Sequence, residues 1–147
     1  MIPRVGEPPL PGQRYRLRHG VYALLPARNG LLVTLQHDPE PELQLPGGGI
    51  DPGESPLRAL HREVMEETGW TIAAPRRMGA FRRFVFMPEY DMWAEKLCTI
   101  YLAQPVRQVR APTEPGHTAL VVDAGMAAAE LGNEGDRMFV RRWAARA

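Results

Sequence analysis

A glycine-rich turn that runs directly into a capped helix is the feature that most constrains this chain. Residues 46–49 read Pro-Gly-Gly-Gly. This sequence ends an extended segment and lets the backbone approach a ligand closely, because glycine has no Cβ. Ser55 is a favoured N-cap and Pro56 suits the first helical position. Gly69 supplies a C-terminal stop, so the spacing predicts a helix over 56–68.

One face of this predicted helix carries three carboxylates. At about 100° per residue, Glu63, Glu66 and Glu67 fall together, beside an apolar stripe made of Leu57, Leu60, Val64 and Thr68. Three like charges one turn apart repel one another. The cluster is therefore expected to be stable as three carboxylates only when cations bind it, and oxygen ligands favour hard ions such as Mg²⁺ or Mn²⁺. Arg62 lies beside the cluster and can hold one glutamate by a charge-assisted hydrogen bond.

The alternative for each residue alone is an ordinary helix surface. A lone glutamate on a helix is usually a solvated charge, and Arg62 with Glu66 is a common i,i+4 pair. Taken jointly, however, nine positions at fixed spacing do not arise by chance in a chain of this composition.

Residues 48–70 resemble the signature of the Nudix hydrolase family. That signature is Gly, five residues, Glu, seven residues, Arg-Glu, an aliphatic residue, any residue, Glu-Glu, any residue, Gly and a bulky apolar residue. Every position matches: Gly48, Glu54, Arg62, Glu63, Val64, Glu66, Glu67, Gly69 and Trp70. The resemblance implies an α/β/α sandwich with a mixed sheet, a loop-helix-loop motif, and hydrolysis of a nucleoside diphosphate linked to another moiety.

The resemblance also implies roles for the motif residues. The expected ligands of Mg²⁺ or Mn²⁺ are the Gly48 carbonyl oxygen and the carboxylates of Glu63, Glu66 and Glu67. Glu63 ranks first as general base, Arg62 orients a glutamate, and Glu54 is a nearby supporting carboxylate. Some members recruit a further acidic ligand before a later strand, where this chain has His117. Four other acids could substitute, although a solvated loop charge is the favoured interpretation of each: Glu89, Asp91, Glu95 and Glu114.

The rest of the chain predicts one domain. Its 147 residues, 44% hydrophobic and 24% charged, suit a single globular core. Residues 1–13 are rich in Pro and Gly and predict an extended arm before a single domain over 14–147. Apolar runs around Asn29-Gly30 predict a hairpin, which favours a mixed sheet in an α/β or α+β layer fold. The remaining expected elements are strands at 79–87, 96–103 and 118–122, loops at 88–95 and 104–115, and helices at 124–131 and 136–145.

Charge and hydropathy limit the partners. A net charge of +1 gives no field that favours bulk nucleic acid or a membrane surface, and no apolar run reaches a transmembrane length. The N-terminus lacks the apolar core of a signal peptide, and the lone Cys98 suits a buried position in a reducing compartment. We therefore expect a cytoplasmic protein that binds a small-molecule nucleotide, with no stable nucleic-acid or membrane partner. Dimers are common among homo-oligomers, so a homodimer is one assembly that the sequence leaves open.

Substrate contacts are indicated more weakly than the metal site. Tyr90 and Trp93 could stack a nucleobase or simply cover the core edge. Arg18 could pair with phosphate, although an exposed strand position explains it as well. The family resemblance implies that Asn133 could read a purine, as an Asn before the last helix does in one branch of the family; an Asn there is equally well a turn or cap residue. The favoured substrate is a nucleoside triphosphate, including oxidised forms, and the first alternative is ADP-ribose or a similar nucleotide sugar. A non-catalytic nucleotide-binding module and an enzyme acting on the 5′ end of RNA are the other classes.

Overall fold

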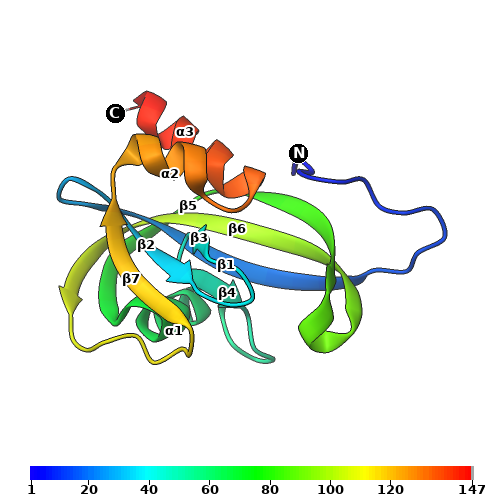
Figure 1. Cartoon of the computed structure of the whole chain (residues 1–147), viewed down its shortest axis with the longest axis horizontal. Coiled ribbons are helices and arrows are strands. Elements are labelled where there is room, and N and C mark those ends of the chain that lie inside the picture. The colour runs from blue at the N-terminus through cyan, green and yellow to red at the C-terminus, as the bar shows by residue number, and fades with distance from the viewer. Residues whose placement is uncertain (147) are drawn as a thin grey trace.

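The computed structural model describes residues 1–146, which form a mixed β-sheet between helices (Figure 1). The strands are β1 (Arg16–Ala27), β2 (Gly30–Gln36), β3 (Glu42–Gln44), β4 (Gly47–Gly49), β5 (Trp70–Met87), β6 (Met92–Gln108) and β7 (His117–Val122). The helices are α1 (Pro56–Thr68), the 3₁₀ turn η1 (Pro88–Tyr90), α2 (Ala124–Glu130) and α3 (Glu134–Arg146). The order β3-β2-β1-β6-β5 forms the main path, with β4 beside β1 and β7 beside β2.

The sheet is mixed because one strand pair is parallel. β1 runs parallel to β6, whereas the other named pairs are antiparallel. The predicted hairpin is confirmed: Ala27 pairs with Gly30, which leaves two residues in the turn. Asn29 has a φ of 70° there, a left-handed conformation that Asn tolerates better than most residues.

Alternating residues of β1 feed two separate cores, as the twofold period of a strand requires. Val21 and Leu25 pack toward α1 through Leu60 and Val64. Leu24, between them in sequence, belongs to the core under α2 and α3. Figure 1 shows α1 on one side of the sheet and the α2–α3 pair on the other. The expected α/β/α sandwich is therefore confirmed.

Three local expectations need correction. β5 begins at Trp70 rather than 79, and β6 spans Met92–Gln108 rather than 96–103. The intervening loop shrinks to residues 88–91, and the first part of the expected 104–115 loop is strand. Leu57, placed on the apolar stripe of the helix, is 44% exposed because it lies in the first turn, outside the packed part of α1.

The first 13 residues contain no helix or named strand, and backbone hydrogen bonds join them to β5. Arg82 of β5 donates its N–H to the Pro3 carbonyl and accepts the Val5 N–H, both at 2.9 Å. Val5 is buried as a result. The boundary at residue 13 stays a prediction. Within residues 1–146, every helix is too short or too polar to cross a lipid bilayer.

Candidate active site

The glycine turn forms β4 and brings the helix carboxylates against backbone. Gly48 pairs with Val21 of β1. A Cβ built on Gly48 would lie 2.5 Å from the carboxyl carbon of Glu63, so no larger residue fits while Glu63 holds this position. The Gly47 N–H donates to Glu67 Oε1 at 3.1 Å. Two glutamates one helical turn apart therefore contact the same three-residue strand.

Helix α1 has the predicted bounds, and its caps explain them. The Ser55 hydroxyl oxygen accepts the Arg58 N–H at 3.2 Å. Gly69 has a φ of 76° and donates its N–H to the Met65 carbonyl at 2.9 Å. A side chain at Gly69 would also collide with the Arg110 carbonyl. The caps fix where the helix begins and ends, and so fix which carboxylates face β4.

Arg62 organises the acidic cluster. Its Nε donates to Glu54 Oε2 at 2.7 Å and its Nη2 to Glu54 Oε1 at 2.8 Å, a bidentate pair. Its Nη1 donates to Glu63 and to Glu66, both at 3.0 Å, and its Nη2 reaches the Gly49 carbonyl at 3.1 Å. The hydrogen bond from Arg62 lowers the pKa of Glu54 to about 2. One guanidinium thus ties the preceding loop to the helix.

This network corrects the expectation that the carboxylates need cations to coexist. Arg62 already supplies positive charge to Glu63 and Glu66. Glu67 is only 7% exposed, and burial raises its pKa to about 8, partly offset by the Gly47 hydrogen bond and reinforced by Glu63. Burial also raises the pKa of Glu63. Without metal, the cluster therefore reduces its repulsion by ion pairing and by keeping a proton on Glu67 near neutral pH.

The donor chemistry fits a hard divalent ion. Within residues 1–146, no three His, Cys, Asp or Glu side chains already converge as a metal site. The donors at hand are the carboxylates of Glu63, Glu66 and Glu67 and the backbone of Gly48, all oxygen, which suits Mg²⁺ or Mn²⁺. Gly48 has no side chain to fill the space beside Glu63.

His117 occupies the position at which some family members are expected to supply a further acidic metal ligand. Its Nδ1 lies 2.9 Å from the Thr34 hydroxyl and its Nε2 lies 3.8 Å from Glu67 Oε2. Glu114 lies nearby, since its N–H donates to the Glu66 carbonyl at 2.9 Å and its charge contributes to the raised pKa of Glu67. Of the other candidates, Glu95 instead pairs with Arg82 at 3.5 Å.

A cleft of about 330 Å³ opens beside this cluster. Gly48 and Glu67 line it, as do Arg18, Tyr90 and Asn133, so the structure brings these sequence-derived candidates together. The Arg18 guanidinium carbon lies 4.9 Å from the Tyr90 ring centre. The Asn133 side chain also caps α3, accepting the backbone N–H of Asp136 at 2.8 Å, which confirms the capping interpretation; contact with a purine stays a prediction.

Trp93 does not line this cleft. It packs against Phe86 and Tyr15, with ring centres 5.2 Å and 5.9 Å apart, which matches the alternative that it covers the core edge. The cleft residues that sequence reasoning did not single out include Lys96 and Asp136, whereas Arg83, at the start of an expected strand, was one of several arginines that could pair with phosphate. Lys96 shares a face of the sheet with Arg83 only through the register of β5 and β6, which the sequence does not reveal.

Comparison with known proteins agrees with the geometry. A family model described as the NUDIX domain matches residues 14–143. A structure described as a NUDIX hydrolase from Nitrosomonas europaea superposes with a TM-score of 0.74 at 19% identity, covering 88% of this chain and 90% of that one. The MutT protein from Methanosarcina mazei Go1 gives a TM-score of 0.70 at 21% identity, covering 92% and 98%.

Two kinds of curated relatives match shorter stretches. A Bacillus subtilis (strain 168) protein named "Putative 8-oxo-dGTP diphosphatase" is 31% identical over 50% of this chain and 50% of its own length. An RNA pyrophosphohydrolase of Helicobacter pylori (strain G27) is 62% identical over 26% of this chain and 25% of its own. The chain thus spans half or less of these relatives. The family model, by contrast, covers most of the chain, and the chain belongs to the Nudix domain family.

Proposed function

We propose that this chain is a Mg²⁺- or Mn²⁺-dependent pyrophosphohydrolase that cleaves a phosphoanhydride bond of a nucleoside triphosphate, whether oxidised or not. One observation carries the proposal. The Gly48 backbone and the Glu67 carboxylate open onto the same cleft as an aromatic ring and an arginine, Tyr90 and Arg18. Two of the proposed metal ligands therefore line the same cavity as the proposed nucleotide contacts.

The roles of the residues follow from their contacts. When bound, the metal ion neutralises phosphate charge and makes a bound water more acidic. Glu67 is held by the Gly47 N–H, and Glu63 is held by Arg62 against Gly48. Burial gives Glu63 a raised pKa, so it is a stronger base than an exposed carboxylate and suits removal of a proton from the attacking water. The Arg62 pairs fix both the helix and the loop before the chemistry begins.

Three alternatives are less well supported: a nucleotide sugar as substrate, the 5′ end of RNA as substrate, and a non-catalytic binding module. The relative from Bacillus subtilis is named for 8-oxo-dGTP, which supports a triphosphate over ADP-ribose. The Helicobacter pylori relative is named for RNA, but it matches over a quarter of each chain and the net charge here is only +1. A non-catalytic binding module would not need the complete carboxylate set that this chain has. The cytoplasmic location and the homodimer stay predictions.

A substrate panel tests the proposal. The purified chain, with Mg²⁺ or Mn²⁺, is offered oxidised and unmodified nucleoside triphosphates, ADP-ribose and 5′-triphosphorylated RNA, and the products are identified. We expect metal-dependent turnover that is fastest with a triphosphate. Glu67→Gln should lower kcat by about 10²- to 10³-fold, the scale of losing one preorganised charge, with its circular dichroism spectrum unchanged.

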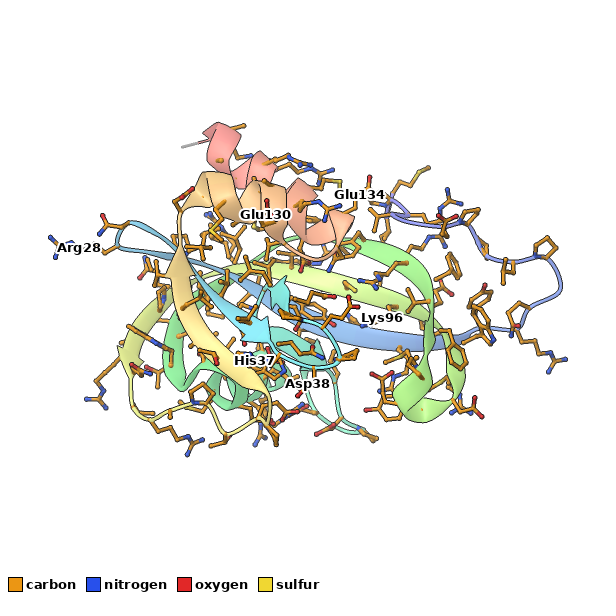
Figure 2. All side chains as sticks on the ribbon, in the orientation of Figure 1. Arg28, His37, Asp38, Lys96, Glu130 and Glu134 are labelled. Carbon is orange, nitrogen blue, oxygen red and sulfur yellow. The ribbon has the colours of Figure 1, made fainter. Side chains whose placement is uncertain are left out.

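The matched control is Glu130→Gln, which removes an exposed carboxylate at the end of α2 (Figure 2). It should retain wild-type kcat. Binding of nucleotides without release of any phosphate product would favour the binding module, and normal turnover by Glu67→Gln would contradict the role assigned to this carboxylate.

A further inference from the structure

Three basic residues stand side by side across the floor of the cleft. In the strand register, Lys96 of β6 is the partner of Arg18 on β1 and of Arg83 on β5. Partners in register project from the same face of a sheet, with Cβ atoms about 5 Å apart. All three line the cleft. We call Arg18, Lys96 and Arg83 the cation row.

The cation row is not neutralised by salt bridges of its own. Among residues 1–146, no carboxylate oxygen lies within 4.0 Å of any of its three charged groups. Two acids that line the cleft act on Lys96 at longer range: Asp136, which is buried, and Glu89. Like charges directly opposite one another in a sheet are destabilising. The pKa of Lys96 is lowered by burial and by the charge of Arg83, so repulsion between these two cations disfavours the charged form of Lys96.

The row begins at the glycine strand and leads away from it. A Cβ built on Gly49 would lie 3.8 Å from Arg18 Nη2, so the first cation lies next to the residue that follows Gly48. Lys96 and Arg83 follow on the next two strands, each about 4.8 Å farther across the sheet. A ligand whose phosphates start at Gly48 and Glu67 would meet these cations in turn.

We propose that the cation row binds a phosphate group of the substrate beyond the diphosphate held at the glutamate cluster. The inference rests on the proposed function and narrows its substrate class. The preferred nucleotide carries at least one phosphate more than the diphosphate of a nucleotide sugar. The additional phosphate extends the polyphosphate or is attached to the ribose. Arginine forks and a lysine ammonium are the groups that bind phosphate oxygens best, and an anion there relieves the repulsion within the row.

Binding without metal tests the row independently of catalysis. Inorganic tripolyphosphate is titrated into the whole chain in EDTA by calorimetry. Lys96→Met removes the charge and keeps an unbranched side chain that is shorter by one atom. It should weaken binding about tenfold, the scale of one charge-assisted contact. Its Tm without ligand should equal or exceed that of the wild type, because the variant loses a like-charge conflict. Misfolding would show as a lower Tm.

Arg28→Met is the matched control. Arg28 is exposed at the tip of the β1–β2 hairpin, whereas Lys96 lies over the body of the sheet (Figure 2). The control removes the same charge from the protein as a whole and should bind tripolyphosphate like the wild type. Equal affinity of Lys96→Met and the wild type, or equal weakening by both variants, overturns the proposal.

Kinetics then separate this proposal from the proposed function. The kcat/KM values for a nucleoside triphosphate, its 3′-phosphorylated form and ADP-ribose are compared. The wild type should have a higher kcat/KM for a substrate with the added phosphate than for ADP-ribose. Lys96→Met should reduce this ratio about tenfold. A higher kcat/KM for the 3′-phosphorylated form than for the plain triphosphate would place the bound phosphate on the ribose. Turnover with an unchanged preference in Lys96→Met refutes the row alone. Loss of all turnover in the wild type with intact tripolyphosphate binding refutes the proposed function and leaves the row.

Discussion

Replacing Gly48 by alanine should disable the metal site while leaving the fold intact. The added Cβ would lie 2.5, 2.6 and 2.7 Å from the three terminal atoms of the Glu63 carboxyl group. Ordinary contact begins at 3.4 Å, so the carboxyl carbon must retreat by about 0.9 Å (3.4 less 2.5). Gly48 has no positive φ, so alanine adds no backbone strain, and the flexible end of Glu63 can move.

That displacement sets the expected magnitude. A misplacement of about 1 Å in a catalytic constellation can cost about 10²-fold in rate. We therefore expect kcat to fall about 100-fold and Mn²⁺ binding, followed by electron paramagnetic resonance, to weaken in parallel. The free energy of unfolding should change by less than about 1 kcal/mol, since no buried apolar contact is lost.

The neighbouring glycine provides the control. A Cβ on Gly49 would meet only Arg18 Nη2 at 3.8 Å, an ordinary contact. Gly49→Ala should thus bind Mn²⁺ as the wild type does. If Gly48→Ala binds Mn²⁺ with wild-type affinity, or if both alanine variants lose it equally, the steric reasoning about Glu63 and β4 is refuted.

Two further predictions concern Glu67 and its neighbour. The pKa of Glu67 is raised from 4.5 to about 8 by burial, so the folded state holds a proton that the unfolded state has released, and stability falls as pH rises between those values. The pH range from 6.5 to 8 lies above the pKa of about 6 of the other buried acid, Asp136. Over this range the metal-free protein should lose about 1.6 kcal/mol of unfolding free energy in denaturant titrations, because the limiting slope of about 1.36 kcal/mol per pH unit falls to half as the pH reaches the pKa of Glu67. Glu67→Gln should lack this pH dependence, and an equal slope in both proteins would contradict the assignment. His117→Ala should lower kcat about tenfold with KM little changed, because the imidazole fixed by Thr34 limits the positions of Glu67 and loss of such supporting contacts costs 10- to 100-fold. A wild-type kcat in that variant would show that His117 does not position Glu67.

The sequence predicted the helix of the site well because its determinants are local. Ser55 and Gly69 act within one turn of the residues they cap, so their effect is readable without knowing the fold. The placement of three glutamates on one face follows from helical geometry alone. The burial of each glutamate could not be predicted from helical geometry. Glu67 is buried by β4 and by His117, which belongs to a strand distant in the sequence.

The lengths of β5 and β6 were underestimated because their determinants are not local. The first half of β5 contains Ala74 with a φ of 52° and register shifts near Arg76 and Gly79, which break the alternating pattern that identifies a strand. Its pairing with the end of β6 compensates, but that pairing joins residues far apart in sequence. The cation row was out of reach for the same reason, because it exists only in the register of β1, β6 and β5.

The positive charge and the proton already present in the glutamate cluster should compete with a metal ion for its carboxylates. An ion entering the site must share Glu63 and Glu66 with Arg62 and must displace the proton that burial keeps on Glu67, whose pKa is about 8. Metal binding is therefore coupled to proton release, and the apparent affinity rises with pH until Glu67 is ionised. Weak binding of Mg²⁺ at neutral pH is what this arrangement predicts for the free protein. A substrate that brings its own phosphate oxygens adds ligands that Arg62 and the proton do not contest, so metal and nucleotide should strengthen each other's binding.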